Sequence, residues 1–287
     1  MERDPLPDEY DFIGPWSEVK LAILRKYAKP YSQILKSNVF YHLYIDGFAG
    51  PGFHVSQKTG EVIPGSPLNA LATEPPFDEY HFIDSNPART QQIQEYARSF
   101  HGNAKVSVYS GDCSEVLMRD VFPRASYEDR KRALCVLDPY NIDLSWDVVL
   151  RAGQMGSVEI FLNFMVMDMN MNVLLNDPDK MDPKQTARMD KFWGDQSWRT
   201  AVYEVSAQTN LFGDPEVVKV ENANDRIAEA YRKRLLTVAG FRHVPPPLKF
   251  PNRLGRTVYY LFFASPNATA NKIVEAIFTE YRGKNWF

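Results

Sequence analysis

Cysteine is scarce in this sequence, and the other residues that commonly bind metals do not gather. The chain of 287 residues has two cysteines, Cys113 and Cys135, too few for a disulfide framework or a cysteine-based zinc site. The five histidines stand far apart, without the short spacings typical of metal ligands; they are His42, His54, His81, His101 and His243. The sequence therefore predicts no metal site.

Long apolar runs are also missing. No stretch approaches the roughly 20 apolar residues that cross a bilayer. Residues 1–5 are polar and acidic, unlike a secretory signal. We therefore expect a cytoplasmic protein without a membrane partner.

The chain has no excess of positive charge. Its formal net charge is −3, with 33 Lys and Arg against 36 Asp and Glu. An extended, non-specific nucleic-acid coat needs many cations to displace counterions, so this class is excluded. The sequence still allows a local basic groove, because two basic runs could either steer a nucleic acid or form solvated surface. They contain Arg119, Arg124, Arg130, Lys131 and Arg132, and then Arg232, Lys233 and Arg234.

What the chain does have is a short apolar strand over 40–46 that runs directly into a glycine-rich turn over 47–52. Glycine has no Cβ and tolerates positive φ, so a ligand can approach such a turn closely. The next helix starts only at Ser66, after a segment over 53–65 that we interpret as a hairpin. This delay argues against a plain dinucleotide-binding loop, which runs straight into its helix.

Strand and helix patterns alternate along most of the chain, which implies βαβ units and a parallel sheet. Strands are expected over 40–46, 80–84, 105–109, 133–137, 158–164, 241–244 and 257–264. We predict a Rossmann-like α/β fold with a mostly parallel seven-stranded sheet and helices on both faces.

Three parts of the chain differ in character. Residues 1–39 are expected to form an arm and two helical pieces, separated at Pro30. The α/β domain takes 40–165 and 226–287. Residues 166–225, rich in Met, Asn, Asp and Pro, are interpreted as a helical insertion over the edge of the sheet that carries the site. Its aromatic residues could form a lid or a core; they are Phe192, Trp193 and Trp198.

Four successive strands end in or lead to an acid: Asp46, Asp84, Asp112 and Asp138. Parallel strands share one orientation, so these acids are expected along one edge of the sheet, where open α/β sheets bind ligands. Each acid alone could belong to an ordinary turn. A random chain would seldom repeat the pattern four times, which favours a binding site.

An adenosine-containing cofactor would need acceptors of this kind. Asp84 is placed to accept from both ribose hydroxyls. Asp112, with Cys113 beside it, is placed to accept from the adenine amino group. Asp46 and the loop backbone would face a charged tail, such as the amino-acid part of S-adenosylmethionine; the loop residues are Gly47, Phe48, Gly50 and Gly52. Lys20 would pair with the tail carboxylate, or else be a solvated helix lysine.

The segment Asp138-Pro139-Tyr140 is the candidate for chemistry. An amine that is to be methylated needs acceptors that direct its lone pair, and the Asp138 carboxylate and Pro139 carbonyl can serve. Tyr140 offers a ring on which a base can stack, an interaction of ~1–3 kcal/mol in nucleic-acid sites. The alternative is a strand-terminal Asp followed by a proline turn.

These residues resemble class I S-adenosylmethionine-dependent methyltransferases and, more narrowly, the three-Cys-motif partner (TcmP) family. The motifs are Ser17-Glu18-Val19-Lys20-Leu21, Tyr44-Ile45-Asp46-Gly47-Phe48-Ala49-Gly50-Pro51-Gly52, Gly65-Ser66-Pro67-Leu68, Phe82-Ile83-Asp84, Leu137-Asp138-Pro139-Tyr140 and Phe192-Trp193-Gly194-Asp195. A fainter similarity links the chain to ribosomal RNA adenine-N6 methyltransferases, whose motif has two prolines where this chain has one. The resemblance implies a methyltransferase fold, an S-adenosylmethionine site and a radical-SAM-like protein partner.

Three hypotheses for function follow. The first is methylation of an amino group of a nucleic-acid base, and the second is methylation of a small molecule or nucleotide. The third is a non-catalytic methyltransferase-like module that serves a partner protein. An occluded pocket above Asp138 would favour the third.

Overall fold

The computed structural model describes residues 11–100, 104–209 and 215–284. Its centre is a seven-stranded sheet in the order β11-β12-β8-β7-β2-β5-β6. The strands are β2 (Tyr41–Asp46), β5 (Glu79–Asp84), β6 (Lys105–Ser110), β7 (Lys131–Leu137), β8 (Val158–Phe164), β11 (Leu248–Pro251) and β12 (Thr257–Ala264). Strand β12 runs antiparallel to both of its neighbours, whereas β8, β7, β2, β5 and β6 are parallel. The predicted mostly parallel α/β sheet is confirmed.

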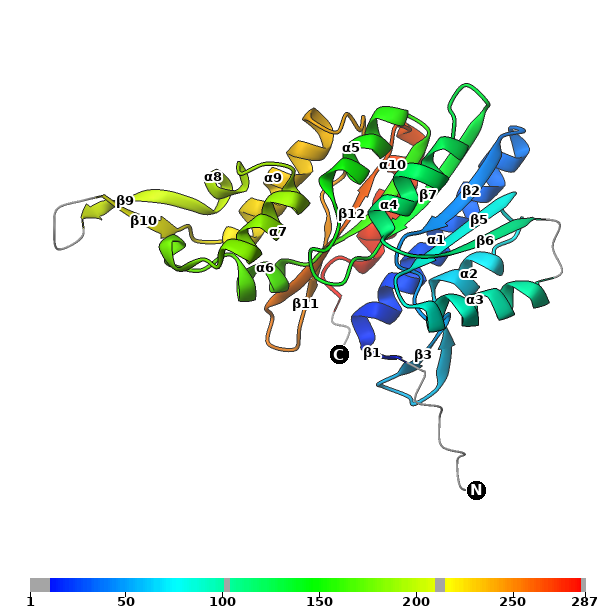
Figure 1. The fold of residues 1–287 in the computed structure, drawn as a ribbon, viewed down its shortest axis with the longest axis horizontal. Coiled ribbons are helices and arrows are strands. Elements are labelled where there is room, and N and C mark those ends of the chain that lie inside the picture. The colour runs from blue at the N-terminus through cyan, green and yellow to red at the C-terminus, as the bar shows by residue number, and fades with distance from the viewer. Residues whose placement is uncertain (1–10, 101–103, 210–214, 285–287) are drawn as a thin grey trace, which may run out of the picture.

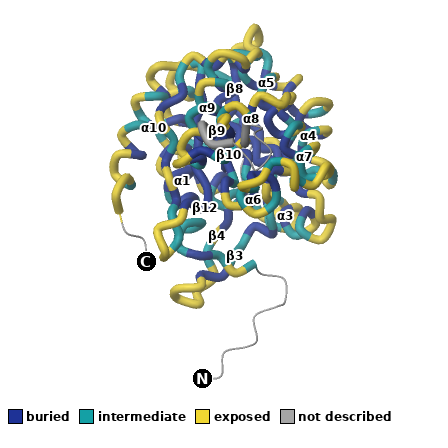
Figure 2. Tube along the Cα trace, turned by 90° about the vertical axis from the view of Figure 1, so that its left-hand side faces the viewer, coloured by how far each residue is buried: buried dark blue, intermediate teal, exposed yellow. Residues whose placement is uncertain are grey.

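Helices cover both faces of this sheet, as Figure 1 shows. One face packs against α1 (Pro15–Ser37), α2 (Ser66–Leu71), α3 (Pro87–Ser99) and α10 (Ala268–Tyr281). The other packs against α4 (Cys113–Val116), α5 (Trp146–Met155) and α9 (Ala223–Thr237). A π-helical turn (Leu117–Val121) and a 3-10 turn (Phe122–Arg124) continue α4. The central strands are therefore buried on both sides (Figure 2), which explains their largely apolar sequences.

The start of the chain differs from the prediction in one respect. Helix α1 is a single helix that contains Pro30, not two pieces, and it begins at Pro15 after Gly14. Its buried face packs against β2 and α10, and this packing outweighs the backbone hydrogen bond that proline removes. The hairpin predicted over 53–65 is present as β3 (Phe53–Ser56) and β4 (Val62–Pro64). A short strand, β1 (Asp11–Ile13), pairs parallel to β3.

Residues 166–225 are not wholly helical. Besides α6 (Val166–Asn172), a 3-10 turn (Pro178–Lys180), α7 (Pro183–Trp193) and α8 (Trp198–Val202), they contain an antiparallel hairpin. Its strands are β9 (Tyr203–Thr209) and β10 (Pro215–Lys219), and it reaches away from the body of the molecule in Figure 1. Val205 and Val217 are exposed, so apolar residues in these strands do not indicate a buried face. The alternation of apolar and polar residues that usually predicts a strand is therefore of no help here.

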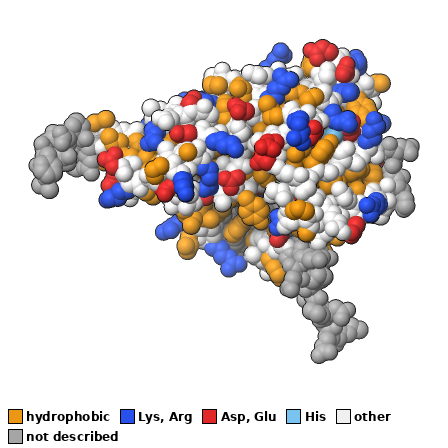
Figure 3. All heavy atoms as spheres, in the orientation of Figure 1, with side chains coloured by type: hydrophobic (Ala, Val, Ile, Leu, Met, Phe, Trp, Pro, Cys, Tyr) orange, Lys and Arg blue, Asp and Glu red, His pale blue; other side chains and the backbone are white. Residues whose placement is uncertain are grey.

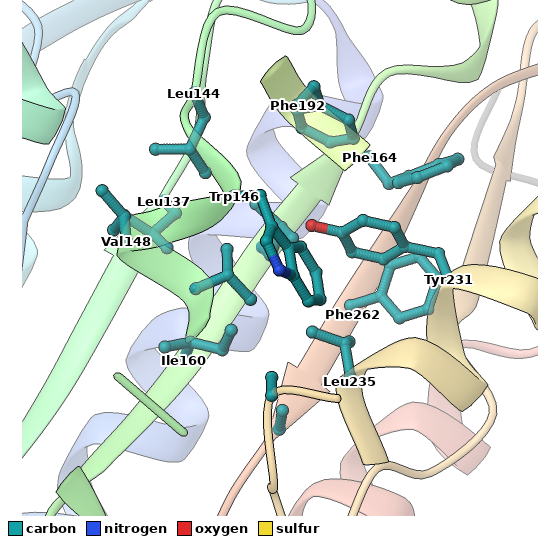
Figure 4. Packing of buried hydrophobic residues seen from close by; sticks show 14 of the residues in the cluster. Leu137, Leu144, Trp146, Val148, Ile160, Phe164, Phe192, Tyr231, Leu235 and Phe262 are labelled. Atoms are coloured by element: carbon teal, nitrogen blue, oxygen red, sulfur yellow. The ribbon is translucent and has the colours of Figure 1, made fainter. Parts of the chain in front are cut away.

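The aromatic residues of this segment belong to the core and do not form a lid. Phe192, Trp193 and Trp198 are at most 2% exposed. Phe192 stacks on Tyr231 of α9 with ring centroids 5.5 Å apart, and Trp146 of α5 meets the same tyrosine edge-on. Figure 4 shows these rings converging on the sheet. The segment is thus anchored to the α5–α9 face of the sheet.

The strand that the sequence predicts over 241–244 is not present there. In that segment His243 forms only an isolated bridge to Ser265. Strand β11 instead follows the prolines, at Leu248–Pro251, where Phe250 stacks on Tyr259 of β12 at 4.4 Å between ring centroids. Burial of that ring outweighed the turn signal of the proline run.

Candidate functional site

The parallel strands bring the four acids to one edge of the sheet, and a pocket of about 640 Å³ opens there. Most of the predicted site residues line it: Lys20, Gly47, Phe48, Gly50, Asp84, Asp112, Cys113, Asp138, Pro139 and Tyr140. Asp46 and Gly52 are not part of the lining. Residues from β1 and the start of α1, among them Trp16, form another wall.

The N–H groups of residues 47–50 in the glycine loop are hydrogen-bonded within the protein. Four successive N–H groups are bonded: Gly47 to Val136 O (2.9 Å), Phe48 to Asp46 Oδ1 (3.2 Å), Ala49 to Ile83 O (2.9 Å) and Gly50 to Asp84 Oδ2 (2.9 Å). The loop is therefore not a cradle of free N–H groups for a phosphate or carboxylate. Its carbonyl groups are what it can offer, and carbonyls suit a ligand that donates, such as an ammonium group.

Glycine is required in this loop for two reasons. A Cβ at Gly47 would lie 2.7 Å from Cys113 Sγ and 3.2 Å from Leu137 Cδ2, closer than packed atoms allow. Gly50 and Gly52 have φ of 67° and 89°, in the left-handed region that side chains rarely adopt.

Asp46 lies beneath the loop and supports it. Its side chain is fully buried; Oδ1 accepts a hydrogen bond from the Phe48 N–H at 3.2 Å, and Oδ2 has no hydrogen-bond partner among the described residues. Burial raises the pKa of Asp46 to about 7, far above the usual range of an aspartate, although the Ser66 side chain and the Phe48 N–H lower it. The structure thus places Asp46 as a support for the loop, and not as a side chain that faces the pocket.

Asp84 is held in place by two backbone groups, the N–H of Gly50 (2.9 Å) and the N–H of Asn86 (2.8 Å). Each carboxylate oxygen keeps capacity for a further hydrogen bond. Arg89, which sequence reasoning missed, lies 3.9 Å from Asp84 and donates to Asp11 at 2.8 Å. The feature of the sequence that could have indicated Arg89 is its position in the first turn of the helix that follows Asp84.

Asp112 and Cys113 take different positions. Asp112 is exposed at the N-terminus of α4, where it accepts from the Glu115 N–H at 3.0 Å. Cys113 is 6% exposed and packs under Gly47. Burial raises the pKa of the Cys113 thiol well above its usual value, so this residue fills space and is not a nucleophile.

Asp138 is held by two side chains from distant parts of the sequence. Lys20 Nζ binds its Oδ2, and Asn163 Nδ2 donates to its Oδ1 at 2.7 Å. The Lys20 side chain is 11% exposed and the Asp138 side chain 32%. The alternative of Lys20 as a solvated helix lysine is therefore wrong. Beside this pair Pro139 is buried, whereas Tyr140 is 68% exposed at the rim of the pocket.

A second hollow, of about 780 Å³, lies beside this pocket and was not predicted. Thr257 lines it, and the adjacent Val258 lines the first pocket. Its charged and amide side chains are Lys219, Lys249, Arg256, Glu221, Asp225, Asn170, Asn176, Asn222, Asn224 and Asn252. Its lining residues include parts of α6, the start of α9 and the β11–β12 turn.

Neither basic run faces the pocket. Arg130 and Arg132 stack on Phe40, with the guanidinium carbons 4.6 and 4.7 Å from the ring centroid, next to the start of β2 and so at the opposite edge of the sheet. Arg234 binds Asp195 at 2.6 Å and stacks on Trp146. Charges of both signs are interspersed on the face seen in Figure 3.

Two features are absent from residues 11–100, 104–209 and 215–284, the ranges that the structure describes. Within them no three His, Cys, Asp or Glu side chains are grouped so that they could hold a metal ion. Nor does any helix there combine the length and apolar character needed to span a membrane.

Comparison with known proteins finds distant structural similarity alone. No family model and no curated protein matches the chain, so membership of the TcmP family stays a prediction. A Legionella pneumophila protein of the DUF519 family is similar over 91% of this chain and 92% of its own, with 11% identity and a TM-score of 0.46. Trm1 of Pyrococcus horikoshii, solved with S-adenosyl-L-methionine, gives 9% identity and a TM-score of 0.47 over 94% of this chain and 60% of its own. A Thermobifida fusca protein described as a methyltransferase gives 13% identity and a TM-score of 0.41, over 88% and 80% of the two chains. At these values the similarities carry no argument about function.

Proposed function

We propose that this protein is an S-adenosylmethionine-dependent methyltransferase that acts on an amino group of a nucleic-acid base. The observation that carries the proposal is that Asp138, Pro139 and Tyr140 share one pocket with Asp84 and Asp112. A cofactor bound to Asp84 and Asp112 would therefore lie beside the acceptor groups of Asp138 and Pro139.

The residues of the pocket fit this cofactor. The pocket volume of about 640 Å³ lies within the roughly 300–1,000 Å³ of small-molecule sites. Asp84 can accept from ribose hydroxyls and the exposed Asp112 from the adenine amino group. The loop carbonyls suit the ammonium group of the tail, because the N–H groups of 47–50 are already bonded. Lys20 supplies a cation for the tail carboxylate.

The chain's own contribution to the reaction is positioning. The bound cofactor would supply an electrophilic methyl group. Asp138 and the Pro139 carbonyl would hold the N–H groups of the substrate, so that the nitrogen lone pair is directed at that methyl group. An ionised carboxylate has about four lone-pair sites, so Asp138 can accept from the substrate while Lys20 and Asn163 stay bound.

Two observations favour a nucleic acid as substrate. Tyr140 is 68% exposed at the rim and offers a ring for stacking of a base. The neighbouring hollow carries Lys219, Lys249 and Arg256 among amide side chains, which suit phosphates and base edges. A polymer could thus contact the protein beyond the reacting base.

A second candidate, methylation of a small molecule or nucleotide, is favoured by the position of the basic runs. They lie away from the pocket and cannot steer a polymer toward it. A non-catalytic role is less well supported, because the pocket above Asp138 is open. The radical-SAM-like protein partner implied by the family resemblance remains part of the proposal.

The test is transfer of labelled methyl groups from S-adenosylmethionine to RNA, DNA and small-molecule pools. We expect transfer to RNA or DNA, and its loss in Asp138→Ala with cofactor binding retained within about threefold. Asp147→Ala, an exposed acid on α5, serves as control. Labelling of small molecules alone would select the second candidate. No cofactor binding by calorimetry would refute both enzymatic functions.

A further inference from the structure

Asn163 is a buried polar residue of the pocket lining, and its amide donates to Asp138. It is the penultimate residue of β8 and is 4% exposed, yet it belongs to the pocket lining. Its strand neighbour Leu162 pairs with Leu137, directly before Asp138. The register of the sheet therefore holds the two polar side chains together.

The orientation of the Asn163 amide follows from its neighbour. An ionised carboxylate only accepts hydrogen bonds, so the amide nitrogen must face Asp138, at 2.7 Å from Oδ1. The same nitrogen lies 3.2 Å from Met165 Sδ. The amide oxygen, Oδ1, is buried and has no hydrogen-bond partner among the residues that the structure describes. Since burial of an unpaired acceptor is unfavourable, this atom points to a donor supplied by a ligand.

We infer that Asn163 Oδ1 accepts a hydrogen bond from the amino group of the substrate. This inference rests on the proposed function and deepens it. Asp138, the Pro139 carbonyl and Asn163 Oδ1 would together present three acceptors to one group. An exocyclic amine can satisfy them if one of its two N–H groups is shared between Asn163 Oδ1 and a neighbouring acceptor, whereas a keto oxygen offers these three acceptors no hydrogen. Asn163 is thus a residue that selects amino-bearing bases.

The probes are single-stranded RNA and DNA oligonucleotides that differ in one exocyclic amine: adenine against purine, cytosine against 2-pyrimidinone, and guanine against hypoxanthine. Binding is measured by fluorescence anisotropy with S-adenosylhomocysteine present. We expect the wild-type protein to prefer the amino-bearing member of one pair by about tenfold, the effect of one buried hydrogen bond. In Asn163→Ala the preference should fall to about twofold or less.

Two further variants separate this effect from a loss of structure. Asn163→Ser keeps a hydroxyl donor for Asp138 but lacks the amide oxygen, so the amino preference should fall in it as in Asn163→Ala. Ser265→Ala removes another buried polar side chain, at the opposite edge of the sheet, and should leave the preference unchanged. If Asn163→Ala fails to fold, the comparison of Asn163→Ser with wild-type protein carries the test, and an unchanged preference in it overturns the inference.

The outcomes distinguish this inference from the proposed function. Methyl transfer with an unchanged amino preference in Asn163→Ala would overturn the role of Asn163 and leave the function standing. Absence of transfer, with an amino preference that depends on Asn163, would support the role of Asn163 and remove the function. Equal binding of both members of every pair by wild-type protein would also overturn the inference.

Discussion

Lys20 and Asp138 form an ion pair across the pocket, although 118 positions separate them in the sequence. Lys20 comes from α1 and Asp138 follows β7, so the pair joins the helix at the proposed cofactor side of the pocket to the acid proposed to receive the substrate. The Lys20 ammonium has three donors and can bind Asp138 and a cofactor carboxylate together. The two predicted roles therefore meet at one contact.

Replacement of Lys20 should weaken cofactor binding through the carboxylate of the tail. In Lys20→Met we expect the affinity for S-adenosylmethionine to fall by about tenfold, the range of one charge-assisted hydrogen bond. Binding of 5′-methylthioadenosine, which lacks the amino-acid tail, should change by less than about twofold. Calorimetry measures both, and Lys26→Met, on the same helix but half exposed, is the matched control. Equal losses for the two ligands would show that Lys20 does not contact the tail.

The two outer acids should contribute unequally to cofactor affinity. Asp84→Ala removes a carboxylate that is 8% exposed and is proposed to accept from two ribose hydroxyls, so we expect a loss of about a hundredfold. Asp112→Ala removes an exposed carboxylate with one predicted contact, and about a tenfold loss is expected. Asp120→Ala, which removes an acid bound to Arg119 on the surface, is the control. If Asp84→Ala binds S-adenosylmethionine as tightly as the wild-type protein, Asp84 does not contact the cofactor.

The close contact between Gly47 and Cys113 predicts a compensating pair of substitutions. Gly47→Ala places a Cβ 2.7 Å from Cys113 Sγ, and such overpacking costs about 1–3 kcal/mol. Cys113→Ala removes the sulfur atom, so the double variant should recover more than half of the lost free energy of unfolding. Denaturant unfolding of the four proteins measures the coupling. If the losses in free energy of unfolding from the two single substitutions simply add in the double variant, the contact between the new Cβ and Cys113 Sγ is not the cause of the destabilisation.

Glu159 predicts a pH dependence of stability that is separate from the site. This fully buried carboxyl accepts from Tyr27 and Ser265, and its burial raises its pKa from 4.5 to about 7. Between these values the folded protein keeps a proton that the unfolded chain releases, so this group lowers the free energy of unfolding as pH rises from about 4.5 to about 7.

Thermal unfolding at several pH values tests this expectation. The stability of Glu159→Gln relative to wild-type protein should increase across that window, since glutamine does not ionise. Glu61→Gln, on the exposed β3–β4 hairpin, should follow the wild-type curve in parallel. A constant difference between Glu159→Gln and wild-type protein would contradict the raised pKa.

Much of the fold could be predicted from local patterns. The apolar runs that end in Asp46, Asp84 and Leu137 carry their own secondary-structure signal, because strands buried on both faces are continuously apolar. Strand β11 and the β9–β10 hairpin could not be predicted in the same way. Their pairing depends on partners elsewhere in the fold, and their sequences show prolines or exposed valines.

The candidate site was predicted in part. Residues at strand ends, such as Asp84 and Asp138, were found because parallel strands put them on one edge. Arg89 and Asn163 were missed, since one lies on a helix and the other inside an apolar strand. Asp46 was expected to face a ligand, but the structure places it under the loop, where burial raises its pKa to about 7.

The sequence by itself determined the alternation of strands and helices, the glycine loop and the row of acids, because each depends on the chemistry of neighbouring residues. The tertiary structure decided which acid faces the pocket, which supports the loop and which is paired. Those outcomes depend on contacts between distant segments, such as Lys20 with Asp138 and Asn163 with Asp138. Burial and pairing set the charge and the free lone pairs of a carboxylate, and neither can be read from the residues beside it in the chain.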